Sequence, residues 1–115
     1  MKPVEKVDIY GTDIFIVTTK KKWKKLCRQF KWLDRKAYRS YGYTHFHHGS
    51  NTIVLWINKE ANLDRGQLVN TCTHESIHAA GFLLEASGHS ISGGDEPFAY
   101  LSGWLAQLLW TEVTK

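Results

Sequence analysis

The sequence predicts a single α+β domain, and three observations carry this prediction. An alternating, β-branched run lies near the N-terminus, and residues 52–58 form a second apolar, β-branched run. Two long stretches after residue 64 repeat apolar residues at steps of three and four, which is typical of helices that pack one face on a core. A chain of 115 residues can bury such a core without disulfides. We therefore expect one domain over residues 1–115, with a small, mostly antiparallel sheet and helices on one side of it.

The N-terminal half predicts a β-hairpin, a helix and two further extended segments. Residues 6–19 alternate around a turn at residues 11–13, as the two strands of a hairpin do. Residues 20–33 have a helical spacing of apolar side chains, with lysines on the other face. Residues 38–48 are rich in Tyr, Phe and His and predict an extended strand or a loop, and residues 52–58 predict a strand. The apolar face of the helix consists of Trp23, Leu26, Cys27, Phe30 and Leu33.

The C-terminal half predicts two helices joined by a short loop rich in Gly and Ser. The first helix spans residues 65–86, with Asp64 as its N-cap and Gly88 as its C-terminal stop. The second helix begins at Glu96, with Asp95 as its cap. Its apolar stripe consists of Phe98, Leu101, Trp104, Leu105, Leu108 and Leu109.

The most informative feature for function is an H-E-x-x-H pattern at residues 74–78, inside the predicted helix 65–86. Residues four apart lie one turn apart on one helix face, so His74 and His78 can bind one metal ion together. Glu75 can hold a water molecule at that metal and accept its proton. The alternative interpretation is an ordinary helix with two surface histidines and with Glu75 as a solvated charge.

A third metal ligand has to come from outside this pattern, because a catalytic zinc site uses three protein ligands and leaves a fourth position for water. The extended motif H-E-x-x-H-x-x-G-x-x-H matches at Gly81 but requires a histidine where Leu84 stands. Glu85 lies two turns after the second histidine, too far along the helix axis. We expect Glu96 to be the third ligand, since it begins the next helix one short loop away. Ligation by Asp95, and a role of Glu96 as an ordinary first-turn acid, stay open.

Several other side chains are candidates for catalysis or for a second metal site. Tyr100 lies one turn after Glu96 on the same helix face, where its hydroxyl could donate a hydrogen bond to a developing oxyanion; a core aromatic is the alternative. His89 lies in the loop as a possible oxyanion donor or metal ligand, or as a solvated histidine. His45 and His47 share one face of a predicted strand and could bind a second metal ion.

The pattern at residues 74–78, followed by Asp-Glu-Pro-Phe-Ala-Tyr at residues 95–100, resembles the zincin metallopeptidases of the gluzincin type. More narrowly, it resembles compact zincin-like proteins encoded by bacteriophages and prophages. The resemblance covers roughly the last half of the chain. It implies a minimal zincin-like fold in which the two motif histidines and Glu96 hold zinc and the motif glutamate is the general base. It also implies a peptide or protein substrate aligned on a sheet edge, and we expect residues 52–58 to offer that edge.

A local basic block provides a competing interpretation. Residues 20–39 carry ten Lys or Arg against one acid, Asp34, whereas the whole chain has a net charge of only +4. Cations interleaved with Trp and Tyr favour weak, non-specific and salt-dependent binding of nucleic acid; the solvated face of a helix is the plainer alternative. A catalytically silent zinc-containing binding or inhibitor protein is the other alternative to a zinc metallopeptidase.

The compartment is predicted from the cysteines and from the distribution of apolar residues. Cys27 and Cys72 lie in helical stretches without a C-x-x-C pair, which favours reduced thiols in a reducing cytosol. Residues 1–6 have no apolar leader segment, and no apolar run approaches the roughly 20 residues that span a bilayer. We therefore expect a cytoplasmic protein without a membrane partner.

Overall fold

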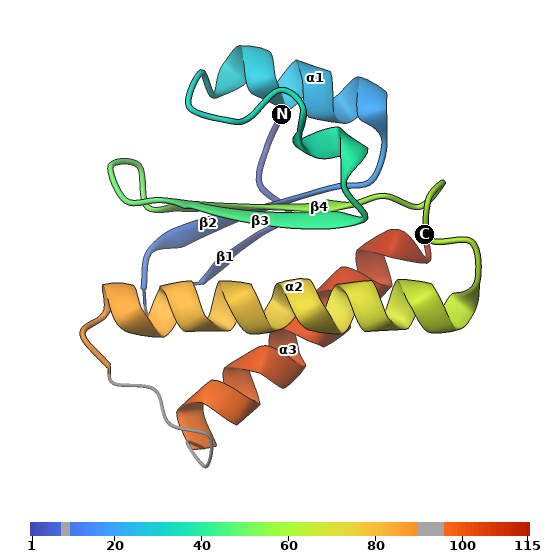
Figure 1. Cartoon of the computed structure of the whole chain (residues 1–115). Coiled ribbons are helices and arrows are strands. Elements are labelled where there is room, and N and C mark those ends of the chain that lie inside the picture. Colours follow the sequence, from blue (N-terminus) through green and yellow to red (C-terminus); the bar gives the residue numbers. More distant parts are fainter. Residues whose placement is uncertain (8–9, 90–95) are drawn as a thin grey trace.

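The four strands of the computed structural model form one sheet in the order β1-β2-β4-β3, with helices against both faces (Figure 1). The structure describes residues 1–7, 10–89 and 96–115. Its elements are β1 (Glu5–Val7), β2 (Thr12–Val17), α1 (Lys20–Gln29), the 3₁₀ helix η1 (Ala37–Arg39), β3 (Gly42–His47), β4 (Thr52–Ile57), α2 (Arg65–Ala86) and α3 (Glu96–Val113). The α+β class and the hairpin of β1 and β2 are confirmed.

The sheet is mixed, with its parallel pair at the centre. β1 pairs with β2 and β3 with β4 in antiparallel fashion, but β2 and β4 are parallel, with Ile14 opposite Ile53. Parallel neighbours need a long crossover connection, and the segment that contains α1 supplies it. The prediction of a mostly antiparallel sheet is therefore correct for the outer pairs and wrong for the central pair.

Helices cover both faces of the sheet, so the prediction of helices on one side is wrong. Ile14 and Ile16 of β2 belong to the core shared with α2 and α3, whereas Phe15 and Val17 belong to the core shared with α1. β4 alternates in the same way, and all six of its residues are buried. A strand that is apolar on both faces requires a cover on both faces. The continuous apolar run at residues 53–57 is the sequence signal for this arrangement.

α1 is shorter than the predicted helix 20–33. The Thr19 side chain caps its start by accepting a hydrogen bond from the Lys22 N–H. The helix ends at Gln29, since Phe30 is extended and donates its N–H to the Leu26 carbonyl. The apolar spacing continues past the helix because the following loop also packs its apolar side chains on the α1 core.

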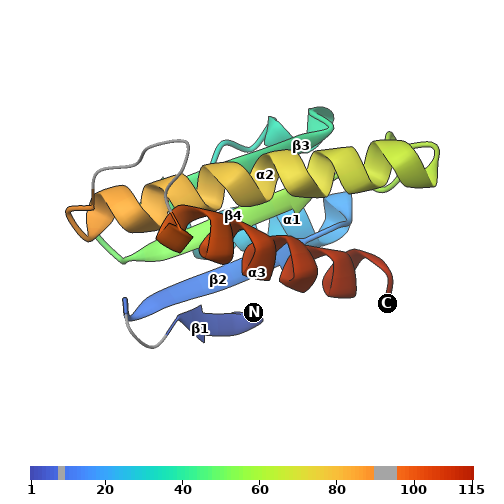
Figure 2. The ribbon, with the colours of Figure 1, turned by 90° about the horizontal axis from the view of Figure 1, so that it is seen from below.

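α2 has the predicted bounds, 65–86. The Asp64 side chain accepts a hydrogen bond from the Gln67 N–H at 2.8 Å, and Gly88 follows the helix with a positive φ of 83°. α3 begins at Glu96 as predicted, and its expected cap, Asp95, lies outside the described residues. Figure 2 shows α2 over β3 and β4, with α3 beside it toward β1 and β2. The buried stripe of α3 consists of Leu101, Leu105, Leu109 and Val113.

Neither cysteine forms a disulfide, and both thiols are buried. Burial raises the pKa of Cys27, and burial together with the nearby charge of Glu75 raises the pKa of Cys72 to about 11. Both side chains pack in the hydrophobic cores, Cys72 in the core beside α3 and Cys27 in the core beneath α1. Within residues 1–7, 10–89 and 96–115, no helix combines the length and the apolar character that a membrane crossing demands.

Candidate functional site

The two motif histidines converge on one flank of α2. His74 and His78 are both exposed, and their Nε2 atoms lie 3.1 Å apart. Two nitrogens that bind the same tetrahedral zinc ion at about 2.0–2.1 Å lie about 3.3 Å from each other. The separation is that of a hydrogen bond between the two rings, and it also fits a shared metal ion, which requires both nitrogens to present lone pairs to the same point.

Glu75 is buried between α2 and β3, although it is an ionisable residue. Its side chain is 7 % exposed, and its Oε1 accepts a hydrogen bond from the Thr44 hydroxyl at 2.6 Å. Its Oε2 lies 4.0 Å from His74 Nε2. Burying a carboxylate costs several kcal/mol of free energy unless partners compensate, and the Thr44 hydroxyl is the compensating donor that the structure shows. The interpretation of Glu75 as a solvated surface charge is wrong.

A glycine allows β3 to approach α2 beside Glu75. A Cβ atom at Gly42 would lie 2.7 Å from Thr71 Cγ2, closer than real Cβ contacts, and 3.0 Å from Glu75 Oε2, which is tighter than most of them. A larger residue at position 42 would therefore push β3 away from α2 or displace the Glu75 carboxylate. Neither Gly42 nor Thr44 is among the site residues that the sequence predicts. The alternation of β3 could have placed Thr44 on the face of Phe46, but no local signal links it to Glu75.

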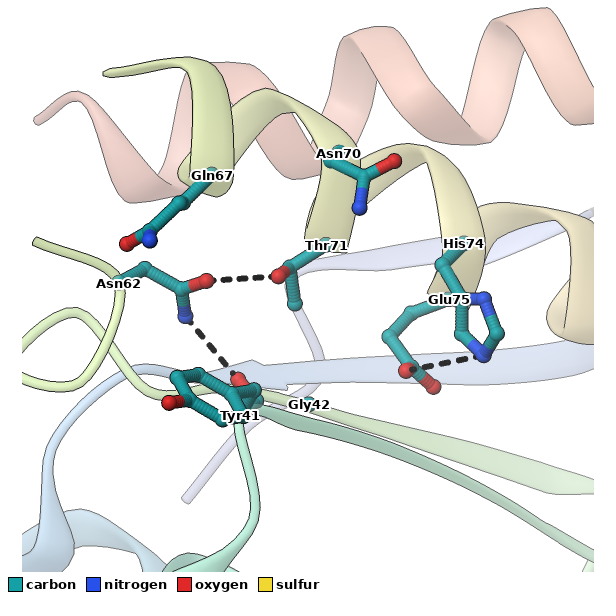
Figure 3. Close-up of a pocket in the computed structure, with 8 residues that line it drawn as sticks. All are labelled: Tyr41, Gly42, Asn62, Gln67, Asn70, Thr71, His74 and Glu75. Carbon is teal, nitrogen blue, oxygen red and sulfur yellow. Dashed lines mark hydrogen bonds and ion pairs between the residues drawn. The ribbon is translucent and has the colours of Figure 1, made fainter. Parts of the chain in front are cut away.

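A polar cavity of about 460 Å³ opens beside Glu75 and His74 (Figure 3). Its far wall is held by hydrogen bonds, because the Thr71 hydroxyl donates to Asn62 Oδ1 at 2.6 Å and Asn62 Nδ2 donates to the Tyr41 carbonyl at 3.2 Å. The lining residues are Tyr41, Gly42, Asn62, Gln67, Asn70, Thr71, His74 and Glu75. A substrate group bound there would lie next to the carboxylate and one of the imidazoles.

Among the described strands, β3 forms the unpaired sheet edge beside this site. β4 lies between β2 and β3 in the sheet, so both of its edges are already paired. The expectation that residues 52–58 offer an edge to a substrate is therefore wrong. β3 is the outermost strand on the side that α2 covers, and Thr44 and Gly42 at the site are part of it.

The structure does not bring Glu96 to the two histidines. Glu96 is exposed, and among the described residues no group of three His, Cys, Asp or Glu side chains could hold one metal ion. Tyr100 is 78 % exposed and lines a separate cavity with β1, including Val7. Leu101 packs into the core, and the neighbouring Tyr100 lies over β1. Glu96, one turn before Tyr100, is exposed to solvent.

The remaining histidine candidates, His89, His45 and His47, have other surroundings than the His74–His78 pair. His89 is half-buried after the end of α2, where its backbone N–H donates to the Leu84 carbonyl at 2.9 Å. His45 and His47 share a face of β3, as predicted, but their rings stack on Trp32 at centroid distances of 4.8 and 4.3 Å. Burial and then the charge of His47 lower the pKa of His45. In the described part of the chain this pair has no third ligand for a metal ion.

A comparison with family models, with curated proteins and with solved structures finds no match. The resemblance to gluzincin metallopeptidases therefore depends on the residues of the two motifs alone.

Replacing Thr44 by valine tests whether this hydroxyl stabilises the buried carboxylate. We expect the variant to lose about 1–3 kcal/mol of unfolding free energy, because Glu75 would stay buried without its hydrogen-bond donor. Urea unfolding at neutral pH measures the change. A serine at this position keeps the hydroxyl and serves as the control, with a smaller loss. A valine variant as stable as the parent chain would show that the hydrogen bond contributes nothing.

Proposed function

We propose that this chain is a zinc-dependent hydrolase, and specifically a small metallopeptidase with Glu75 as its general base. One observation carries the proposal: a buried carboxylate, oriented by Thr44, lies beside two imidazole nitrogens that are 3.1 Å apart. The resemblance of the two motifs to gluzincins supports the same conclusion. A buried carboxylate is costly in free energy, and a helix with only a structural role does not need two converging imidazoles. Together they are the groups that hydrolysis by an activated water molecule requires.

The residues that would hold the metal are His74 and His78. Neutral imidazoles suit zinc as well as other first-row transition metals. We expect Glu96 to be the third ligand. For Glu96 to bind the same metal ion, the first turn of α3 has to move toward the histidine pair. When bound, the metal supplies Lewis-acid chemistry, lowering the pKa of a water molecule and polarising a carbonyl.

The chain's own side chains then handle the proton and the substrate. Glu75 accepts the proton of the attacking water and returns it to the leaving amine, as a general base that becomes a general acid. The Thr44 hydrogen bond holds Oε1 of Glu75, so that Oε2 is left on the side of His74. An extended peptide would pair with the free edge of β3 by strand addition, with one of its side chains in the polar cavity. Oxyanion stabilisation by Tyr100 or His89 stays a prediction from the sequence.

Removing one imidazole tests the metal site. We expect His78→Ala to lower zinc affinity by about 100-fold or more, because one of two converging ligands is lost and even outer-shell changes cost 10- to 100-fold. Competition with a chromogenic chelator measures the affinity. His48→Ala removes an exposed histidine outside the pair and serves as the control, with unchanged affinity.

Turnover by the zinc-loaded chain is measured on a mixed peptide library read by mass spectrometry. Equal zinc affinities of His78→Ala and the parent chain would refute the metal site. Tight zinc binding without cleavage of any peptide would refute the peptidase and would indicate a binding or inhibitor protein.

A further inference from the structure

The face of the molecule opposite the His74–His78 pair carries an uncompensated concentration of positive charge. All ten Lys and Arg residues of segment 20–39 are exposed. Asp34 is the one acid in the segment, and its carboxylate accepts the backbone N–H of Lys36 at 2.9 Å. Among the residues that the structure describes, the ion pairs of lysine with a carboxylate are Lys6–Asp13 and Lys115–Glu112, both outside the segment. Within the described residues, the cations of the block therefore have no carboxylate as an ion-pair partner.

Six of these cations surround one cleft. It has a volume of about 570 Å³ and lies between α1 and the segment that follows it through η1, and Tyr38 also lines it. The Lys20 and Lys24 ammonium groups lie 4.7 and 6.0 Å from the centroid of the Tyr38 ring. The cationic lining residues are Lys24, Arg28, Lys31, Arg35, Lys36 and Arg39. Clustered positive charges repel one another, so the cleft favours an anionic ligand.

We infer that this cleft, with the exposed face of α1, binds the phosphate backbone of duplex nucleic acid. A row of unpaired cations gains free energy there by releasing the counterions of a polyanion. The recognition is by charge and carries no sequence preference, because backbone contacts carry none.

The aromatic residues of the segment favour a duplex over a single strand. Trp23, which the sequence places among the lysines as a possible base-stacking residue, is completely buried and packs on Trp56. Trp32 stacks on Phe30 and on the histidines of β3. With both tryptophans engaged in this way, the aromatic ring that lines the cleft is that of Tyr38, and it already lies under the ammonium groups of Lys20 and Lys24. The block therefore lacks the run of stacking rings that single-strand binders use.

The same burial disfavours an anionic membrane surface as the partner. A helix that binds a bilayer interface buries an apolar face in it. The apolar face of α1 is already buried against the sheet, with Trp23, Leu26 and Cys27 at its centre. None of the large hydrophobic side chains that the described residues expose belongs to segment 20–39.

The inference is tested with two variants that lose the same charge. One variant combines Lys24→Gln, Lys31→Gln and Lys36→Gln in the cleft, and the control combines Lys2→Gln, Lys59→Gln and Lys115→Gln elsewhere on the surface. Binding of a 20-base-pair DNA duplex, an RNA duplex of the same sequence and vesicles of phosphatidylserine and phosphatidylcholine is measured by fluorescence titration at several salt concentrations. Circular dichroism establishes that both variants are folded.

We expect the parent chain to bind both duplexes, and the cleft variant to bind them about tenfold or more weakly. Its slope of log affinity against log salt should fall in magnitude by about 2–3, since each lost phosphate contact removes about 0.9. The control variant should change affinity less than about twofold. Equal losses in both variants would overturn the inference by showing a net-charge effect. It would also be overturned by tighter binding to the vesicles, or by no duplex binding at low salt. Glu75→Gln should bind the duplexes normally, which separates this test from that of the hydrolase.

Discussion

Replacing Glu75 by glutamine is expected to remove most of the hydrolytic activity while the fold and zinc binding are retained. The amide keeps the shape of the side chain, and its carbonyl oxygen can still accept the Thr44 hydrogen bond that Oε1 now accepts at 2.6 Å. It cannot accept a proton from water, so the general base is lost. Positioned acid–base groups contribute about 10²- to 10⁴-fold to rate, and we expect kcat to fall by that range. The measurement is turnover of a cleaved library peptide by zinc-loaded protein, with zinc content determined on the same sample.

A second glutamate on the same helix provides the matched control. Glu85 is exposed on α2, and Glu85→Gln removes the same charge without touching Thr44 or the histidine pair. This variant should retain full activity. If Glu75→Gln were as active as Glu85→Gln, Glu75 could not be the base. If it lost zinc together with activity, Glu75 would act as a ligand and not as the base.

Replacing Trp23 by alanine is expected to have the largest effect on stability. This side chain is completely buried between α1 and the sheet, where it contacts the rings of Trp56 and Tyr43. Its indole N–H also donates to the Asp34 carbonyl at 3.0 Å and so holds the loop after α1. Truncating a buried tryptophan costs about 3–5 kcal/mol, a large part of the roughly 5–15 kcal/mol that stabilises a typical domain. We expect Tm to fall by about 10–20 °C.

Thermal unfolding followed by circular dichroism measures this loss. Tyr41→Ala is the control, because its side chain is 62 % exposed and should change Tm little. A decrease of less than about 1 kcal/mol for Trp23→Ala would contradict the packing of α1 on the sheet, and with it the argument that this ring does not stack on bases.

Several features of the fold follow from local sequence alone. The spacing of apolar residues and the Asp64 cap predict α2 with its observed bounds, and the alternation at residues 12–17 predicts β2 and its two faces. The pattern that brings His74 and His78 to one flank is also local, since it depends only on the helical repeat. Such features are predictable because neighbours in sequence determine them.

Other features depend on contacts between distant segments. The sequence indicates that Phe15 and Val17 face away from Ile14, but not that α1 covers that face. In the same way, helix geometry places Glu96 and Tyr100 on one face of α3, but the packing of α3 in the core decides that Tyr100 lines a cavity with β1 and that Glu96 does not join the histidine pair.

The sequence by itself therefore determined β2, β4, α2 and the start of α3, the two faces of β2, the histidine pair and the basic block. Only the tertiary structure decided that Glu75 is buried, that Thr44 and Gly42 adjoin it, and that the cations of segment 20–39 surround a single cleft. The physical reason is that backbone periodicity depends on neighbouring residues, whereas the burial and partners of a side chain depend on which faces of distant elements pack together.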